Sequence, residues 1–247
     1  DVEDNSYLRR GKKATHLLFG VDVAVNAANA MYYLPLVTLF NNHTMDVKKK
    51  ALIYDVYAKE MLKLSVGQAT DIRWHNAQSN VNESQYLQMC SYKTGSLSRL
   101  AIQLGGILGD ASQKQLNAFS DFGTSLGVAF QIQDDILNLK PDKEWGKEIG
   151  DDINEGKITL IIINALKSLN DKKKQRLFEI LQKENNSKEE IKEAISIIGE
   201  SDAIEYSKEL AKNIVLENWA NLEKVLDKSD AKNSLKEFAY YVVNRKL

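Results

Sequence analysis

Residues 130–138 read Phe130-Gln131-Ile132-Gln133-Asp134-Asp135-Ile136-Leu137-Asn138, and this stretch decides the fold of the 247-residue chain. It lies within an apolar pattern from Ser112 to Leu139 that predicts one long helix. Ser112 followed by Gln115 is typical of a capping box, in which the two side chains satisfy backbone N–H groups at a helix start. Pro141 follows the predicted end, where a proline stops a helix.

The polar side chains of this stretch fall close to one face of the predicted helix, because positions three and four apart are neighbours. That face carries two carboxylates and two carboxamides: Gln131, Asp134, Asp135 and Asn138. Adjacent carboxylates repel each other unless a cation or a proton lies between them. Carboxylate oxygens suit Mg2+, which binds through one or two carboxylates together with substrate phosphates. A solvated acidic face is the competing interpretation, and it is the better one for an isolated Asp-Asp pair.

The composition indicates one globular domain. With 43% apolar residues the chain can bury a large core, and no Gly-, Ser- or Pro-rich linker divides it, so we expect a single domain over residues 1–247. The net charge of -1 gives no electrostatic reason to expect nucleic acid as a partner. Cys90 is the only cysteine, which excludes a disulfide within the chain and favours a reducing compartment, the cytoplasm.

No membrane-spanning segment is predicted. The apolar run around Leu160–Ile163 is far too short to cross a bilayer, and no signal peptide opens the chain. The sequence begins at Asp1 without an initiator Met, and we expect an N-terminal segment to be missing.

The remaining sequence also reads as helices joined by turns. Helical patterns cover residues 21–40, 47–74, 83–104, 158–168, 171–184, 188–199 and 202–246, the last broken near Lys228. Pro35 should kink the first of them, and Gly105 and Gly106, with Gly109, should end the third. No strand alternation is evident, so we expect an all-α protein with many helices around one core.

An acidic and a basic cluster stand next to each other at the start of the chain. Asp1 and Asp4 are three residues apart and would share a face at a helix end, and Arg9 and Arg10 follow in a glycine-containing loop. Surface salt bridges of little energetic value are one interpretation. The other is a cation site beside an anion site, because arginine pairs bind diphosphate oxygens in bidentate fashion.

Two lysine-containing segments can likewise be interpreted either as ordinary surface or as part of a phosphate-binding site. Lys93-Thr94-Gly95 is either an ordinary surface turn or a helix break at which an ammonium and a hydroxyl meet a phosphate. Lys147 lies in the charge-dense loop from 140 to 156, and Lys157 follows it; loops near a site carry ligand-binding charges. No GxxxxGK[ST], HExxH or CxxC pattern occurs, so a P-loop is excluded and a zinc site has no support.

These segments, in this order, resemble the motifs of the trans-isoprenyl diphosphate synthases, the polyprenyl synthetases. Asp1-Val2-Glu3-Asp4 is similar to the first aspartate-rich motif without its leading Asp, and Leu8-Arg9-Arg10-Gly11 is similar to the arginine pair after it. The remaining motifs are matched by Gly67-Gln68-x-x-Asp71, Lys93-Thr94-Gly95, Phe130-Gln131-x-x-Asp134-Asp135, Gly146-Lys147 and Glu155-Gly156-Lys157. The resemblance runs from Asp1 to about Leu166. Each motif alone is weak, and their common order makes the resemblance specific.

The resemblance implies a fold and an activity. The fold is an isoprenoid synthase-type bundle of many helices around a central apolar cavity. The activity is Mg2+-dependent condensation of isopentenyl diphosphate, head to tail, with the carbocation formed from an allylic diphosphate, giving geranylgeranyl or farnesyl diphosphate. A homodimer is also implied. The small-residue stretches from Ala24 to Leu36 and from Ala118 to Ala129 are interface candidates, although core packing explains them equally well.

The resemblance also implies residue roles. Metal binding, with three Mg2+ ions when substrate is bound, falls to Asp1, Asp4, Asp134 and Asp135. Lys93, Thr94 and Gln131 would stand beside the reacting allylic group. The substrates are bound by Arg9, Arg10, Lys93, Gln131, Lys147 and Lys157, with Arg10 on the isopentenyl diphosphate.

Two departures from the family pattern bear on activity. Asn138 stands where many members have the last Asp of the second motif, and a neutral carboxamide is the weaker ligand. The family's N-terminal helices, including the first Asp of the first motif, are absent, which predicts that these 247 residues alone are inactive.

Two other functional classes stay open. One is a non-catalytic subunit of a heteromeric synthase, which usually loses motif aspartates. The other is a terpene cyclase or head-to-head synthase, which has no need of the Arg10 and Gly-Lys elements.

Overall fold

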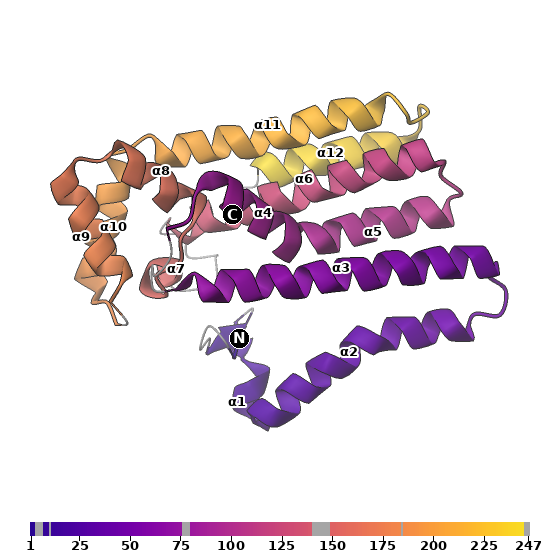
Figure 1. The fold of residues 1–247 in the computed structure, drawn as a ribbon, viewed down its shortest axis with the longest axis horizontal. Helices are drawn as coiled ribbons and strands as arrows, with labels where there is room; N and C mark the ends of the chain where they lie inside the picture. Colours follow the sequence, from indigo (N-terminus) through magenta and orange to yellow (C-terminus); the bar gives the residue numbers. More distant parts are fainter. Residues whose placement is uncertain (3–6, 10, 76–79, 140–148, 184, 245–247) are drawn as a thin grey trace.

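The computed structural model describes residues 1–2, 7–9, 11–75, 80–139, 149–183 and 185–244. Apart from one hairpin, this part of the chain consists of helices joined by turns (Figure 1). The hairpin pairs β1 (Leu8–Arg9) with antiparallel β2 (Lys12–Lys13), and Gly11 at its turn has a φ of 73°. The helices in chain order are α1 (Thr15–Phe19), α2 (Val21–Asn41), α3 (Val47–Arg73), α4 (Glu83–Lys93), α5 (Gly95–Leu108), α6 (Gln113–Asn138), α7 (Asp151–Asn154), α8 (Leu160–Ser168), α9 (Asp171–Leu181), α10 (Lys188–Gly199), α11 (Ala203–Glu223) and α12 (Asp230–Asn244).

Most helices begin and end where the sequence predicts. The capping box of α6 is formed, because the Ser112 side chain accepts from the Gln115 backbone N–H and the Gln115 side chain accepts from the Ser112 backbone N–H. Gly109 caps the end of α5 as predicted, but Gly105 and Gly106 do not end the helix, which continues to Leu108. Gly106 serves close packing instead: a Cβ there would lie 2.9 Å from a methyl carbon of Leu116 on α6. The hairpin and the shortest helices were not predicted, because segments of two to five residues show no periodicity.

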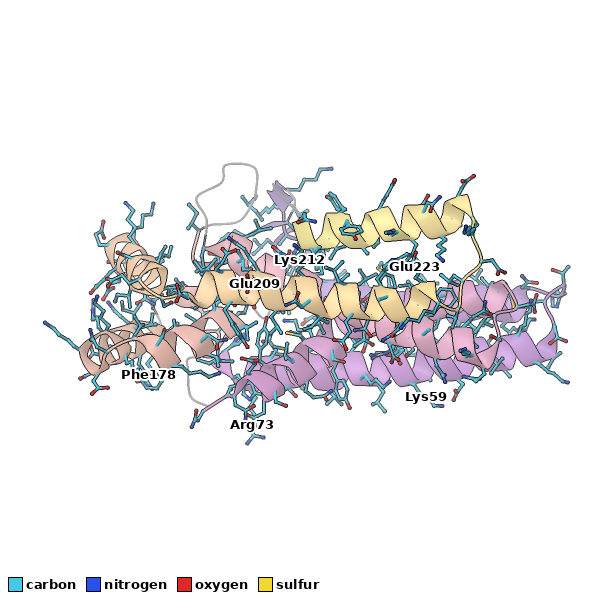
Figure 2. All side chains as sticks on the ribbon, turned by 90° about the horizontal axis from the view of Figure 1, so that it is seen from above. Lys59, Arg73, Phe178, Glu209, Lys212 and Glu223 are labelled. Carbon is cyan, nitrogen blue, oxygen red and sulfur yellow. The ribbon has the colours of Figure 1, made fainter. Side chains whose placement is uncertain are left out.

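The core is organised around α6. This helix lies between α5 on one side and α11 with α12 on the other (Figure 1). In the view from above, α11 runs along the bundle with α12 beside it (Figure 2). The apolar face of α6, including Phe122, Ala129 and Ile132, is fully buried, and Phe122 packs edge-to-face on Trp219 of α11. The predicted all-α architecture is confirmed.

α2 differs from the core helices because none of its residues is buried. It contains Pro35, and the ribbon of α2 changes direction along its length, as predicted (Figure 1).

By length and composition α2 could cross a membrane, with a mean hydropathy of 1.3 over an 18-residue window. The prediction of no membrane-spanning segment was based on the short apolar run at Leu160–Ile163, and it did not consider α2. A single apolar helix is weak grounds for a span, because buried helices of other proteins share this composition.

Candidate active site

A cavity of about 480 Å³ lies where the hairpin, α2, α3, α4, α6 and α7 meet. These elements bring together segments that are up to about 150 residues apart in the sequence. Carboxylates and cations share its walls: Asp1, Asp71, Asp134, Asp135 and Asp152 with Arg9, Lys93 and Lys157. The apolar part of the lining comes from Leu64 of α3, Met89 of α4 and Ile158.

The polar face of α6 points into this cavity. Gln131, Asp134, Asp135 and Asn138 all line it, as their spacing predicts. They are not equivalent, because Asp135 and Asn138 are buried whereas Gln131 and Asp134 are half-buried. The acidic face is therefore a cavity wall, and the alternative of a solvated surface is wrong.

Asp135 is held by hydrogen bonds at both carboxylate oxygens. Tyr86 of α4 donates its hydroxyl to Oδ2 at 2.6 Å, and Gln131 donates Nε2 to Oδ1 at 2.9 Å. Burial, followed by the negative charge of Asp152, raises the pKa of Asp135 to about 7, although both hydrogen bonds act to lower it. Burial likewise raises the pKa of the Tyr86 hydroxyl well above its ordinary value.

The Lys93-Thr94-Gly95 segment is a helix break inside the site, not a surface turn. α4 ends at Lys93 and α5 begins at Gly95. The Lys93 ammonium forms an ion pair with Asp71 of α3, and the Thr94 hydroxyl donates to Gln131 Oε1 at 2.7 Å. The break thus connects α3 to α6 through three predicted site residues.

Glycines set the distance between these elements. A Cβ at Gly127 of α6 would lie 2.5 Å from Gly95 Cα and even closer to Ser98 Oγ of α5. No side chain larger than hydrogen fits there without moving a helix. Gly127 lies one turn before Gln131, so this contact brings the Thr94 break within hydrogen-bond reach of α6.

Asn138 has a structural role in the site. Its Oδ1 accepts the Asp152 N–H at 3.2 Å, and its backbone carbonyl accepts the Gly150 N–H at 2.9 Å. Asp152 in turn pairs with Lys157 at 3.3 Å, and Lys157 also pairs with Glu155. Asn138 therefore anchors the α7 segment that carries Asp152 and Lys157 into the cavity.

The N-terminal residues reach the same cavity. Asp1, a predicted metal ligand, accepts a hydrogen bond from Arg9 Nε at 2.7 Å, and both residues line the cavity. Asp1 and Arg9 thus form the salt bridge of the first interpretation, and this salt bridge lies at the wall of the cavity. The predictions for Asp4, Arg10 and Lys147 lie outside the described residues.

Sequence reasoning missed Tyr86 and placed Asp152 only in a charged loop. Tyr86 stands seven residues before Lys93, two turns back on the same face of α4, so the helical period could have indicated it. Asp152 had no such signal, because its place depends on how the chain folds back after α6.

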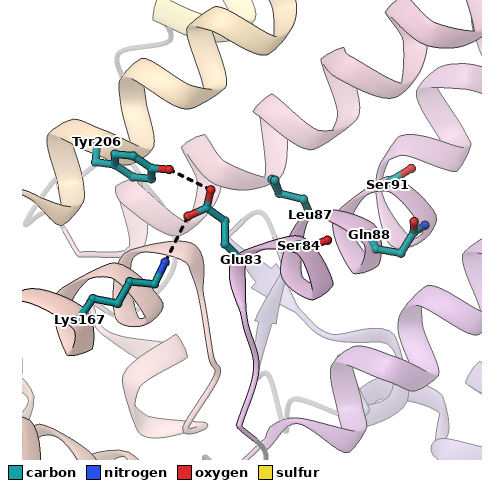
Figure 3. Close-up of a pocket in the computed structure, with 7 residues that line it drawn as sticks. All are labelled: Glu83, Ser84, Leu87, Gln88, Ser91, Lys167 and Tyr206. Atoms are coloured by element: carbon teal, nitrogen blue, oxygen red, sulfur yellow. Dashed lines mark hydrogen bonds and ion pairs between the residues drawn. The ribbon is translucent and has the colours of Figure 1, made fainter.

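A larger surface pocket of about 750 Å³ lies between α4, α8 and α11 (Figure 3). Its Glu83 carboxylate accepts from the Tyr206 hydroxyl at 2.8 Å and pairs with Lys167 at 3.5 Å. Glu83 is the single carboxylate among the residues that line it, and it is already paired with a lysine. The candidate active site is therefore the smaller, charged cavity.

Comparison with known proteins assigns the family. A family model described as polyprenyl synthetase matches residues 1–198. The chain is 38% identical over 209 residues to a short chain isoprenyl diphosphate synthase of Methanocaldococcus jannaschii, covering 84% of this chain and 62% of that protein. It is 30% identical over 250 residues to a geranylgeranyl diphosphate synthase of Sulfolobus acidocaldarius, covering 100% of this chain and 75% of that protein. The chain thus spans less than two thirds of the first relative's length.

Solved structures share the whole fold of the chain. A geranylgeranyl pyrophosphate synthetase from Pyrococcus horikoshii superposes with a TM-score of 0.90 at 33% identity, covering 100% of this chain and 74% of that one. A polyprenyl synthase from Caulobacter crescentus, complexed with calcium and isoprenyl diphosphate, gives 0.88 at 25% identity, covering 100% and 73%. These structures confirm the isoprenoid synthase-type fold implied by the order of the motifs. The chain belongs to the polyprenyl synthetase family.

Proposed function

We propose that the protein formed by this chain is a Mg2+-dependent prenyltransferase that condenses isopentenyl diphosphate head to tail with an allylic diphosphate. One observation carries the proposal: Asp134 of α6, Lys93 at the α4–α5 break and Lys157 after α7 line the same cavity. A carboxylate that attracts a metal ion and ammonium groups that attract phosphate oxygens are what departure of a diphosphate requires.

The donor set fits a metal ion that is shared with the substrate. In the part of the chain that the structure describes, no group of three or more His, Cys, Asp or Glu residues could hold a metal by itself. Mg2+ commonly binds through one or two carboxylates and takes its other ligands from phosphates and water. Asp1 and Asp134 would supply carboxylates here, with Asp4 assigned from the resemblance. Asp135 contributes differently, because both of its oxygens already accept protein hydrogen bonds.

Bound Mg2+ would supply positive charge to the departing diphosphate. The chain's own cations do the same: Lys93, Lys157 and Arg9 would bind the allylic diphosphate, while Arg10 and Lys147 are assigned from the resemblance alone. In the structure Lys93, Lys157 and Arg9 pair with Asp71, Asp152 and Asp1 respectively. Binding of a diphosphate would therefore exchange carboxylate partners for phosphate oxygens.

The Thr94 and Gln131 oxygens would face the developing allylic cation. Because the Thr94 hydroxyl donates its hydrogen to Gln131, the lone pairs of its own oxygen remain as acceptors. Oxygen dipoles held in place before the reaction stabilise positive charge without reorganisation.

The product proposed is geranylgeranyl or farnesyl diphosphate, in line with the relatives' names, short chain isoprenyl and geranylgeranyl diphosphate synthase. Leu64 and Met89 form apolar wall next to the charged groups, which suits the first part of a hydrocarbon chain. A single domain over residues 1–247 and a location in the cytoplasm stay predictions.

A homodimer is proposed through α2. The core position of Phe122, Leu126 and Ala129 favours core packing for the stretch from Ala118 to Ala129. The stretch from Ala24 to Leu36 lies instead on exposed α2, with Met31, Tyr33 and Leu34 each at least 60% exposed. Light scattering checks this, and a monomer at micromolar concentration would contradict it.

The decisive experiment supplies the chain, with any residues that flank it in the native protein, with Mg2+ and isopentenyl diphosphate. Dimethylallyl, geranyl and farnesyl diphosphate are added in turn, and the products are read by mass. A ladder that stops at geranylgeranyl or farnesyl diphosphate is expected. No product with any primer, from folded protein, would overturn the proposal in favour of a non-catalytic subunit. A cyclised product that survives Arg10→Ala would favour a terpene cyclase.

A further inference from the structure

Tyr86 and Asp135 form a buried pair behind the site. The Tyr86 hydroxyl lies 2.6 Å from Asp135 Oδ2, and the two residues are only 1% and 5% exposed. A buried hydroxyl next to a buried carboxylate is worth more than the same pair in water, because water does not compete for either group. Core packing accounts for the ring of Tyr86, but neither that packing nor the roles assigned above explains its hydroxyl.

The pair controls the orientation of Gln131. The Tyr86 hydroxyl donates to Asp135 Oδ2, and Asp135 Oδ1 accepts a hydrogen bond from the NH2 end of the Gln131 carboxamide at 2.9 Å. The carboxamide oxygen is thereby turned toward Thr94, whose hydroxyl donates to it at 2.7 Å. A flipped carboxamide would place oxygen against oxygen at Asp135 and nitrogen against the donor hydroxyl at Thr94.

We propose that Tyr86 is a positioning residue for the prenyl transfer. Tyr86 holds Asp135, Asp135 orients Gln131, and Gln131 orients Thr94. In this chain of contacts Asp135 accepts hydrogen bonds from Tyr86 and Gln131. Its neighbour Asp134 is then the carboxylate that faces the metal ion. The inference depends on the proposed function, because the oxygens fixed in this way are those assigned to face the allylic cation.

The kinetic test compares two Tyr→Phe variants. Tyr86→Phe removes the hydroxyl inside the site, whereas Tyr206→Phe removes one that donates to Glu83 at 2.8 Å in the surface pocket (Figure 3). We expect Tyr86→Phe to lower kcat about 10- to 100-fold with little change in either KM, the usual loss when a group behind a functional residue is removed. Tyr206→Phe should leave both constants unchanged. Equal kinetics for the two variants would overturn the proposal.

A binding test separates positioning from metal ligation without relying on turnover. Mn2+ bound in the presence of inorganic pyrophosphate is measured by electron paramagnetic resonance for Asp134→Asn, Asp135→Asn and Tyr86→Phe. Only Asp134→Asn should weaken Mn2+ binding, by roughly 10-fold or more, while Asp135→Asn should bind Mn2+ as wild type and still lose kcat. Loss of Mn2+ binding in Asp135→Asn equal to that in Asp134→Asn would show that Asp135 is a direct ligand and overturn the assignment.

Different results refute the proposed function and the positioning role of Tyr86. An inactive wild-type protein refutes the proposed function. An active wild type with an unaffected Tyr86→Phe variant refutes only the positioning role. Thermal unfolding of each variant shows whether it is folded. If Tyr86→Phe unfolds at the assay temperature, the kinetics of wild type, Tyr86→Phe and Tyr206→Phe are compared at a temperature below its melting temperature. Equal kcat values for the three proteins there would overturn the proposal.

Discussion

Gly67 of α3 and Lys93 of α4 lie backbone against backbone, so that a Cβ at position 67 would stand 2.3 Å from the Lys93 nitrogen and 2.8 Å from its Cα. Backbone atoms cannot give way as the end of a flexible side chain can. The contact brings α3 close enough for Asp71, one turn after Gly67, to pair with the Lys93 ammonium.

Gly67→Ala should therefore displace α4 from α3 and shift Lys93 within the cavity. We expect a loss of about 1–3 kcal/mol in the free energy of unfolding, typical of an overpacked interior, and a fall in kcat/KM. Denaturant unfolding and steady-state kinetics measure the two effects. Gly105→Ala is the matched control, because nothing lies within 4 Å of a Cβ at Gly105 of α5. Alanine there should leave activity unchanged, and equal losses in both variants would show that the close contact at Gly67 does not matter.

Replacing the Lys93 ammonium tests its proposed role on the diphosphate. Lys93→Met should lower kcat/KM for the allylic substrate by roughly 10²–10³-fold, the loss seen when one preorganised charged donor is removed from a reaction site. Lys59→Met is the control, since Lys59 pairs with Asp55 at 2.7 Å on the exposed side of α3. If Lys93→Met keeps the kcat/KM of wild type, the role of Lys93 is limited to its ion pair with Asp71.

The sequence predicted the α6 side of the site well, and for a physical reason. Gln131, Asp134, Asp135 and Asn138 share one regular helix, so their common face follows from the helical period alone. The Lys93-Thr94-Gly95 break was harder to predict, because a surface turn and a buried break have the same local sequence. Its interpretation was settled by the contacts of Thr94 with Gln131 and of Lys93 with Asp71.

Contacts between distant segments could not be predicted. The Tyr86–Asp135 pair joins residues 49 positions apart, and no local pattern marks a tyrosine as the partner of a carboxylate on another helix. The capping of Asp152 by Asn138 depends on the return of the chain after α6. The sequence also left the exposure of α2 open, because small and aromatic residues suit a subunit interface and a packed core equally well.

Metal binding should depend on diphosphate. Since the described residues hold no cluster of three or more candidate ligands, Mg2+ alone should raise the melting temperature little, and pyrophosphate alone should also raise it little. Both together should stabilise the protein, by about 2.7 kcal/mol at a ligand concentration 100 times the Kd. Differential scanning fluorimetry with and without a chelator measures this. An equal rise with Mg2+ alone would indicate a metal site made by the protein without substrate.

A buried ion pair links α3, α5 and α6 below the site. Arg99 donates from Nε to Glu60 at 2.7 Å and from Nη1 to the Thr124 hydroxyl at 2.6 Å, and both charged residues are less than 10% exposed. Removing one partner should cost about 3–5 kcal/mol, because a buried charge is left unpaired. Glu60→Met should thus be strongly destabilised, whereas Arg99→Met should cost less, because Lys63 still pairs with Glu60 at 2.9 Å. The double variant should be close to wild type in stability, since similar-sized apolar residues replace buried pairs at little cost.

The same pair makes a prediction about acid. Burial acts to raise the pKa of Glu60, but hydrogen bonds from Arg99 and Lys63 and their positive charges lower it below its ordinary value of 4.5. A carboxyl whose pKa is lower in the folded state contributes stability above its unfolded pKa, and this stability is lost as pH falls through the folded pKa. Between neutral pH and pH values below 4.5, wild type should therefore lose more unfolding free energy than the Glu60→Met, Arg99→Met double variant. Denaturant unfolding at several pH values measures the difference. Parallel curves for the two proteins would mean that Glu60 has the same pKa in the folded and unfolded states, and that the ion pair contributes nothing to acid sensitivity.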